Sequence, residues 1–333
     1  MDELLIVGQG LVDPAYQLGL YLVAISIILA GFILGIGKAL GSTKLQSWGV
    51  EEFAQAIING ALLGFIASAS FSLSQLADSF VPKDLIQNCS YSQFPLFIQT
   101  TICLQDNLLN IIYQSMEKLT KLSYQLGSLS TITIKFNVID AIPLLSLRYM
   151  AENFSTLSNQ FLAISTLLET QKQFLLFIAQ TGFSIFLPLG LLLRMFFITR
   201  KIGGAILAGA IGFYIFYPLF LLSLSINERS INLIFEKFSK EADSLLLATS
   251  PFPQLDWNKE QDVINLFFNS LGSSPTLASK VSSIFSFGSQ FLGVIQLHSY
   301  IFISLSIICT LIFIYQLALA LGSEFNLQLF ESL

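Results

Sequence analysis

Long runs without a charged residue constrain this chain most. Asp, Glu, Lys and Arg are absent from five stretches, each longer than the roughly 20 residues that cross a bilayer core as a helix. Only 11% of the 333 residues are charged and 54% are hydrophobic, whereas soluble domains carry about 25% charged residues. There are too few charges to cover a soluble surface, so we predict an integral membrane protein. The five stretches are residues 14–37, 53–77, 173–193, 202–227 and 281–323.

These stretches are typical of transmembrane helices and not of membrane-spanning strands. Backbone amides in lipid must be hydrogen-bonded within their own segment, which a helix achieves alone. A transmembrane strand alternates apolar and polar residues over about 10 positions, whereas these stretches are continuously apolar. The sequence therefore predicts an all-α polytopic membrane protein embedded in the lipid bilayer. Its five predicted spans lie near residues 16–39, 54–77, 173–197, 203–225 and 290–321.

The positions of the basic residues predict the orientation of the spans, because basic loops tend to stay in the cytoplasm. The tail before the first span contains no Lys or Arg. Lys38 and Lys44 follow the first span, and Arg194, Arg200 and Lys201 lie near a tight connection at residue 200. A cleavable signal peptide needs a basic first region, so the first span is expected to be retained. We predict a multi-pass protein of the cell (plasma) membrane, with the N-terminus outside and the C-terminus in the cytoplasm.

Five spans in this orientation divide the chain into five predicted parts. The region between the second and third spans begins and ends outside, so it contains either no further crossing or two, at 85–105 and 141–168. Seven spans are therefore the alternative. The predicted parts are residues 1–77, an N-terminal tail and two transmembrane helices; 78–172, an outer region; 173–226, a transmembrane hairpin; 227–289, a second outer, amphipathic region; and 290–333, the last transmembrane helix and a cytoplasmic tail.

Two cysteines and two acceptor triplets favour an outer location for the middle region. Cys89 and Cys103 are 14 residues apart, a spacing compatible with a disulfide in an oxidising compartment. Two unpaired thiols are the alternative. Asn88-Cys89-Ser90 and Asn153-Phe154-Ser155 fit the acceptor pattern for N-glycosylation, although such triplets also arise by chance.

The outer region contains two predicted amphipathic helices. One covers residues 106–126, with Asp106 as a potential N-cap and Gly127 as a potential end. The other has apolar residues at alternating spacings of three and four, which is typical of a coiled-coil seam. It is expected to run unbroken into the third span, and its partner is either residues 106–126 or another subunit of a homo-oligomer. The seam residues are Leu147, Met150, Phe154, Leu157, Phe161, Ile164 and Leu168.

Two further segments have a recognisable period. Residues 131–138 alternate apolar and polar side chains, which predicts a short half-buried strand. In the second outer region, a helix places Ile231, Phe238 and Leu245 on one side and Lys237 on the other. Amphipathic helices of this kind lie on a membrane interface or line a vestibule, and we favour the interface.

Residues suited to catalysis are scarce. His298 is the only histidine and stands within an apolar span, where a hydrogen bond to a neighbouring carbonyl is the simpler interpretation. The sequence has no Cys/His cluster with metal-site spacing, no glycine-rich phosphate loop and no nucleophile elbow. We therefore predict that the protein is not an enzyme and has no catalytic, metal-binding or cofactor-binding residues.

The densest sequence feature is Leu187–Leu219, LPLGLLLRMFFITRKIGGAILAGAIGFYIFYPL. Pro188 is expected to kink one helix and Pro218 to bend the next. Between them lie a tight basic turn and then a pair of glycines that begins the second helix. The sequence therefore predicts a rigid helical hairpin at the cytoplasmic face. An ordinary positive-inside anchor is the alternative.

The order Pro-x-Gly-x-x-x-Arg, then Thr-Arg-x-x-Gly-Gly, then Tyr-Pro-Leu resembles the signature hairpin of the TrbL-like polytopic subunits of conjugation-type (type IV) secretion systems. It is most similar to their archaeal CedA-type DNA-import relatives. The likeness covers about 33 residues, and Trp48, Glu51 and Glu52 before the second span are a weaker match. The matched positions are Pro188, Gly190, Arg194, Thr199, Arg200, Gly203, Gly204, Tyr217, Pro218 and Leu219.

This resemblance implies a membrane channel subunit of a DNA-translocation apparatus, working in an oligomer with other membrane subunits and a separate cytoplasmic ATPase. A conduit for DNA is expected to offer Lys or Arg to the phosphates. The basic turn is one source at the cytoplasmic mouth, but the middles of the spans offer none. The pore is therefore expected to lie between subunits or to be lined by other proteins. The outer regions offer Lys118, Lys121, Lys135 and Arg148.

Two other function classes remain open from the sequence. A small-solute or ion transporter normally shows ionisable or polar residues at mid-membrane, and His298, Gln180 and Asn59 come closest to this pattern. A structural membrane anchor for a surface appendage is the third class. It would need spans and outer helices but no conduit.

Overall fold

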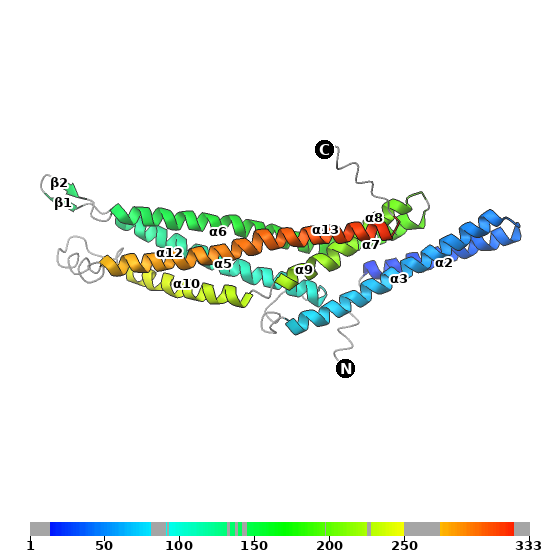
Figure 1. Cartoon of the computed structure of the whole chain (residues 1–333), viewed down its shortest axis with the longest axis horizontal. Coiled ribbons are helices and arrows are strands. Elements are labelled where there is room, and N and C mark those ends of the chain that lie inside the picture. Colours follow the sequence, from blue (N-terminus) through cyan, green and yellow to red (C-terminus); the bar gives the residue numbers. More distant parts are fainter. Residues whose placement is uncertain are drawn as a thin grey trace. The chain divides into compact units, whose positions relative to one another are not determined.

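The computed structural model shows a chain of long helices that divides into two compact units (Figure 1). Unit 1 comprises Met1–Leu104, Gln171–Leu224 and Ile303–Leu333, and unit 2 comprises Gln105–Thr170 and Ser225–Phe302. Three helical runs contribute residues to both units. The structure describes residues 14–80, 91, 93–131, 134–136, 139–141, 145–196, 198–224, 228–249 and 274–322.

Within these residues, five helices are long and apolar enough to cross a membrane, which confirms the prediction of an all-α polytopic membrane protein. Neither of the two further crossings considered from the sequence adds a separate span there. From Leu145 onward, 141–168 belongs to a longer helix, and 85–105 lies partly outside the described residues. The five helices are Tyr16–Ala39, Thr43–Ala77, Leu147–Met195, Arg200–Leu222 and Ser279–Ala320.

Two of the five helices are much longer than a bilayer core. Leu147–Met195 has 49 residues and Ser279–Ala320 has 42, about 74 Å and 63 Å at 1.5 Å per residue, against a core of about 30 Å. Their exposed residues are mainly polar before Phe174 and Leu297, and mainly apolar from those residues onward. The lipid-facing parts therefore begin near Phe174 and Leu297, and the preceding parts are suited to water.

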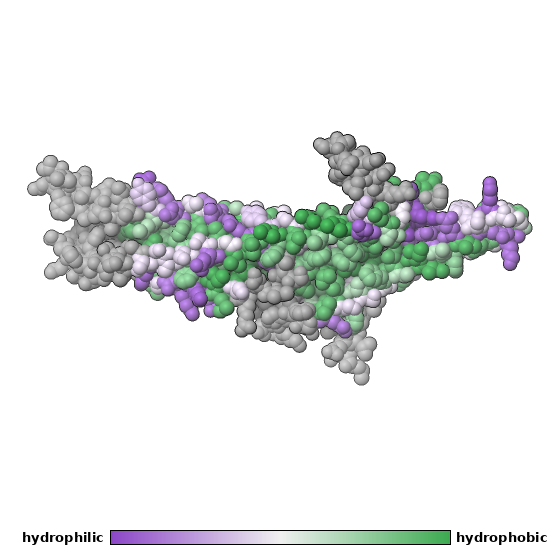
Figure 2. Space-filling model, viewed as in Figure 1, coloured by the Kyte–Doolittle hydropathy of each residue, from purple (hydrophilic) through white to green (hydrophobic). Residues whose placement is uncertain are grey.

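The first of these two long helices runs unbroken from the seam into the third span, as predicted. α6 (Leu145–Phe177) continues through the π-helical segment η1 (Ile178–Gly182) into α7 (Phe183–Met195). Figure 2 shows hydrophilic residues over α6 and α10 and hydrophobic residues along α13. The exposed polar residues of α6 include Asn153, Ser155, Thr156, Asn159, Gln160 and Thr166.

Unit 1 contains the remaining spans. α2 packs against α3 and α7, α7 packs against α8, and α13 packs against α8. Gly41 lies in the short turn between α2 and α3 with a left-handed φ of 65°, a conformation that glycine adopts without a steric penalty. The elements of unit 1 not yet given are α2 (Pro14–Ala39), α3 (Thr43–Phe80), α8 (Arg200–Ile211), η2 (Gly212–Phe216), α9 (Tyr217–Leu224), α13 (Ile303–Ala320) and the first part of α5 (Leu96–Ser130).

Unit 2 is a bundle of four helices: α5, α6, α10 (Glu228–Thr249) and α12 (Ser274–Gln296), the last continuing into η6 (Leu297–Phe302). Phe291 of α12 lies at its centre, with its ring centroid 5.5 Å from that of Phe161 on α6 and 6.3 Å from that of Phe238 on α10. On the other side, Lys118 of α5 reaches Asp243 of α10 at 2.7 Å. Because α5 also bonds α6 through Ser123 and the Ala151 carbonyl, each helix touches two others.

α5 contains the helix predicted at 106–126, but it begins earlier and ends later. It starts at Leu96, directly after Pro95, and continues to Ser130, past the expected end at Gly127. The helix is amphipathic, as predicted, because five apolar residues that share one face are 6% exposed or less. They are Leu108, Ile112, Leu119, Leu122 and Leu126.

The predicted seam on α6 is buried inside one chain. Six of its seven residues are less than 5% exposed, and Met150 is half-buried. Its partners include α5, where Ser123 Oγ donates a hydrogen bond to the Ala151 carbonyl at 2.8 Å, and α12, where Gly288 leaves room for Leu157. The intrachain partner, one of the two that the sequence left open, therefore covers this face. The seam is not available to another subunit, and oligomerisation stays a prediction that needs another surface.

Two smaller expectations have different outcomes. The alternating segment at 131–138 contains a strand, β1 (Ile134–Phe136), which pairs antiparallel with β2 (Ile139–Ala141), Ile134 lying opposite Ala141. The membrane-interface interpretation of the helix in 227–289 is wrong. Ile231, Phe238 and Leu245 are 2% exposed or less, because their face of α10 packs inside unit 2.

Replacing Ser123 with alanine is expected to destabilise unit 2 by about 1 kcal/mol, the typical net contribution of a hydrogen bond between helices. The change removes the hydroxyl with which α5 donates a hydrogen bond to the Ala151 carbonyl of α6. Thermal unfolding of the purified protein in detergent measures the effect. Ser128→Ala is the matched control, because that exposed hydroxyl donates to the Gln125 carbonyl of its own helix. Equal shifts for both variants would contradict the assignment.

Candidate functional site: the α7–α8 hairpin and its contacts with α3

The tight basic turn predicted near residue 200 joins α7 to α8. α7 ends at Met195 and α8 begins at Arg200. Thr199 closes the turn, because its hydroxyl donates to the Leu193 carbonyl at 2.7 Å and its own carbonyl accepts the Gly203 N–H at 2.9 Å. A threonine before the first helical residue thus holds both sides of the hairpin together.

The hairpin glycines allow the two helices to touch through their backbones. A methyl group on Gly203 would lie 2.7 Å from the Arg194 nitrogen and 2.8 Å from the Gly190 oxygen. A methyl group on Gly190 would lie 3.0 Å from the Leu207 nitrogen. Gly204 faces the other way, and its methyl group would lie 3.3 Å from the Leu321 oxygen at the end of α13. Gly203 therefore leaves no room for a side chain, and Gly190 and Gly204 leave little. Close packing, and not only the start of a helix, favours glycine at these positions.

The two prolines lie within helices. α7 continues through Pro188 from Phe183 to Met195. Pro218 is the second residue of α9 and follows the π-helical segment η2, where the Tyr217 N–H donates to the Gly212 carbonyl. Pro218 has no N–H to donate to the Tyr214 carbonyl, so one regular helical hydrogen bond is lost there. The π-helical turn η2 lies just before this position, and the bend at Pro218 stays a prediction.

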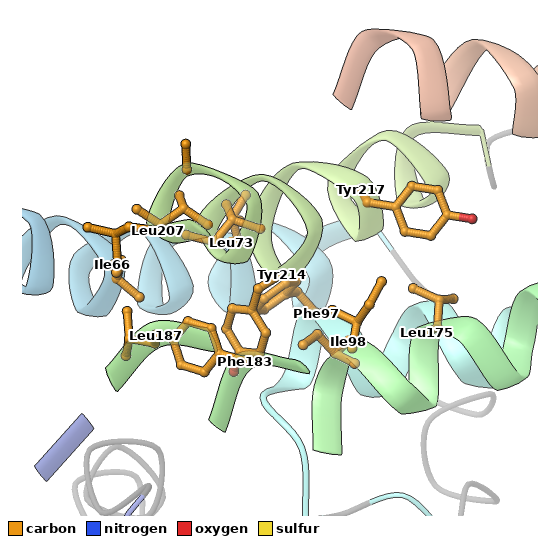
Figure 3. Close-up of a cluster of buried hydrophobic side chains, with 14 of the residues drawn as sticks. Ile66, Leu73, Phe97, Ile98, Leu175, Phe183, Leu187, Leu207, Tyr214 and Tyr217 are labelled. Carbon is orange, nitrogen blue, oxygen red and sulfur yellow. The ribbon is translucent and has the colours of Figure 1, made fainter. Parts of the chain in front are cut away.

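Above the turn, the hairpin packs into an aromatic core of unit 1. The Phe183 and Tyr214 rings stack with centroids 3.8 Å apart, and Phe97 meets Tyr214 edge-on at 6.1 Å. Figure 3 shows these three side chains together, with Tyr217 on the same helical run. Tyr217 is 1% exposed and meets Phe174 edge-on at 5.6 Å. Tyr217, one of the positions matched to the signature hairpin, therefore has a packing role.

The two hairpin arginines turn inward, towards α3. Arg194 is 3% exposed, and its Nη2 donates to Gln55 Oε1 at 2.9 Å. Its Nε and Nη1 are buried and have no hydrogen-bond partner among the described residues. Arg200 binds two carboxylates of α3, reaching Glu51 Oε1 at 3.4 Å and Glu52 Oε1 through Nη2. The hairpin is therefore joined to α3 by polar contacts.

α3 supplies these groups from one face. Trp48, Glu52 and Gln55 are spaced four and three residues apart, which places them on a single side of a helix, and Glu51 lies beside them. The Trp48 Nε1–H donates to Glu52 Oε1 at 3.1 Å, on the carboxylate that also binds Arg200. We call Trp48, Glu51, Glu52 and Gln55 together with Arg194 and Arg200 the α3 clamp. The spacing was visible in the sequence, but nothing there identified Gln55 as a partner of Arg194.

Charge in the α3 clamp is balanced and mostly buried. Two arginines face two glutamates, and the side chains of Arg200 and Glu52 are only 14% and 13% exposed. Burying a charge without a partner is strongly unfavourable, so the two carboxylates explain how Arg200 tolerates this position, whereas Arg194 is bonded to the neutral Gln55. Arginines that served only as a positive-inside anchor would not need carboxylates beside them. Of the three basic residues of the turn, Lys201 alone is exposed.

Three basic residues of unit 2 are also engaged in ion pairs. Lys118 pairs with Asp243 at 2.7 Å, Lys121 with Glu117 at 2.6 Å and Arg148 with Glu152 at 3.2 Å. The Lys121 partner and hydrogen bond lower the pKa of the Glu117 carboxyl. The side chain of Lys135 lies outside the described residues. Unit 2 thus neutralises the three described cations that the sequence offered as phosphate contacts.

Further sequence candidates are the cysteines and the histidine. Cys103, on α5, is disulfide-bonded, and Cys89, its predicted partner, lies outside the described residues. Cys309 is a free, half-buried thiol. His298 lies in η6 with its Nδ1 buried and without a hydrogen-bond partner in the described part of the chain. In that same part, no three His, Cys, Asp or Glu residues gather as a metal site would require.

Comparison of the chain with protein-family models, with curated proteins and with solved structures finds no match. The local geometry of the hairpin is therefore the main structural basis for a function.

Proposed function

We propose that this protein is a membrane channel subunit of a DNA-translocation apparatus, of import or conjugation-like type, powered by a separate ATPase. The observation that supports it best is the contact of Arg200 with Glu51 and Glu52. Both the hairpin and the Trp48–Glu52 segment resemble the same family of secretion subunits. The two segments are 148 residues apart in the chain, and they meet in one ion-paired cluster. If each resemblance had arisen by chance, there would be no reason for the two segments to be in contact.

The burial of basic side chains limits where DNA would pass. Arg194 and Arg200 are turned into unit 1, and Lys118, Lys121 and Arg148 hold carboxylates of unit 2. A strand with one negative phosphate per nucleotide would need cations or solvent along its path. We therefore place the passage between copies of this chain in a homo-oligomer, or between it and other membrane subunits, and wide enough to keep the strand hydrated.

Deleting the gene is expected to abolish DNA transfer between cells, and supplying the wild-type gene to restore it. Two complementing variants sharpen the test. Arg200→Gln breaks the ion pairs of the α3 clamp and is expected to restore little transfer, whereas Lys121→Gln changes an exposed pair of unit 2 and is expected to restore it fully. The amount of each variant in the membrane is measured beside the transfer frequency. Unchanged transfer in the deletion strain would overturn the proposal.

A small-cation transporter is the second candidate, and η6 favours it. Within this span, Ser299 is fully buried, and neither its Oγ nor His298 Nδ1 has a hydrogen-bond partner among the described residues. Polar groups left unsatisfied inside a membrane often mark an ion path, and π-helical turns are frequent at functional sites. This candidate predicts normal DNA transfer in the deletion strain and a cation flux across vesicles that contain the purified protein.

A further inference from the structure

The triplet Asn153-Phe154-Ser155 lies on the water-suited part of α6. Asn153 and Ser155 are both exposed, whereas Phe154 between them is 1% exposed. The residues one turn away on the Asn153 side, Tyr149 and Thr156, are exposed as well. The amide of Asn153 therefore faces open space on the surface of unit 2, where a bulky, hydrophilic group can be carried without disturbing the core.

The disulfide of Cys103 indicates on which side of the membrane this triplet lies. Disulfides form and persist in oxidising compartments and are rare in the cytosol, so Cys103 belongs to the outer side. No described residue between Ala77 and Leu147 is part of a candidate span, and the lipid-facing part of the next span begins near Phe174. The chain from Cys103 to Asn153 therefore stays on one side, the side where N-glycans are attached.

We propose that Asn153 is an N-glycosylation site, modified by an oligosaccharide carried on a polyprenyl phosphate or diphosphate lipid of the same membrane. The amide Nδ2 of Asn153 attacks the anomeric carbon of the first sugar. A new N–C bond forms while the C–O bond to the phosphate breaks, and the lipid phosphate leaves with the electron pair. The amide proton passes to a base of the transferase. Ser155 supplies the hydroxyl that defines the acceptor triplet.

The burial of Phe154 determines when this reaction takes place. In the folded bundle, the middle residue of the triplet is part of the core of unit 2, so the three residues cannot enter a transferase together. The sugar is therefore attached before α6 packs against α5 and α12. Once attached, it covers the polar face of α6. Contacts between subunits must then use another surface, in agreement with the burial of the seam on the opposite face.

Peptide mass spectrometry of the full-length protein, purified from the membrane of its own host, tests the site. The wild-type peptide is expected to carry a sugar on Asn153, and Ser155→Thr, which keeps the triplet, is expected to retain it. Asn153→Gln and Ser155→Ala are expected to lose it completely. Asn159→Gln is the matched control, because Asn159 is exposed on the same helix outside any triplet.

Two results would overturn the proposal. One is recovery of the wild-type Asn153 peptide only in unmodified form. The other is a sugar that persists on Asn153 in Ser155→Ala, which would mean that the acceptor triplet does not direct the modification. A sugar found only on Asn88 counts as the first result, because the two sites lie on different peptides. The outcome does not depend on the proposed function in DNA transfer.

Discussion

Replacing Gly203 with alanine is expected to destabilise the α7–α8 hairpin by about 3 kcal/mol, near the upper end of the usual effect of overpacking an interior. The added methyl group would lie 2.7 Å from the Arg194 nitrogen and 2.8 Å from the Gly190 oxygen. Both neighbours are backbone atoms, which cannot move aside as a flexible side chain would. The two helices must separate, and separation also pulls Arg194 away from Gln55. Thermal unfolding of the purified protein measures the loss.

The matched control lies on the same helix. Gly209→Ala adds an identical methyl group to α8 at a position where, apart from the helix's own backbone and the two chain neighbours, no described atom lies within 4 Å. Without a clash, alanine is the better helix former by roughly 0.5–1 kcal/mol, so this variant is expected to unfold at an equal or slightly higher temperature. If the two variants were destabilised alike, the close approach of the backbones would not be the reason for Gly203.

The spans and the buried faces could be predicted from the sequence because they depend on local patterns. A charge-free run of 20 or more residues identifies a span without knowledge of its neighbours. A spacing of three and four residues likewise identified the buried side of α6, including Phe161 and Leu168, which are 0% and 1% exposed. The start of α5 at Leu96 was missed because Asp106 is a good N-cap. Pro95 is an equally good signal for a helix start.

The partners of those faces could not be predicted in the same way. An apolar side of a helix looks alike whether lipid or another helix covers it, which is why α10 was assigned to the membrane interface. The α3 clamp shows the same limit for polar groups. Gln55 and Arg194 are 139 residues apart, and nothing in the spacing of either segment specifies the other. Only the fold, which packs α2 against both α3 and α7, brings them together.

Removing the charge of Arg200 is expected to cost about 3 kcal/mol, because Arg200→Gln leaves the Glu52 carboxylate, itself 13% exposed, without its cation. The Trp48 N–H remains as a hydrogen-bond donor to that carboxylate, but it carries no charge. Lys121→Gln is the matched control. Its pair with Glu117 is 59% and 64% exposed, and exposed pairs on one helix contribute only about 0.3–0.5 kcal/mol.

The double variant Arg200→Gln with Glu52→Gln separates the α3 clamp from a positive-inside anchor. If the clamp is what matters, neutralising Glu52 removes the buried unpaired charge, so the double variant is expected to regain most of the lost stability. The positive-inside rule depends on Lys and Arg, and acidic residues contribute little to it. An anchor therefore stays as weak in the double variant as in Arg200→Gln. Unfolding in detergent and the yield of correctly inserted protein give the two readouts, and failure of both to recover would contradict the clamp.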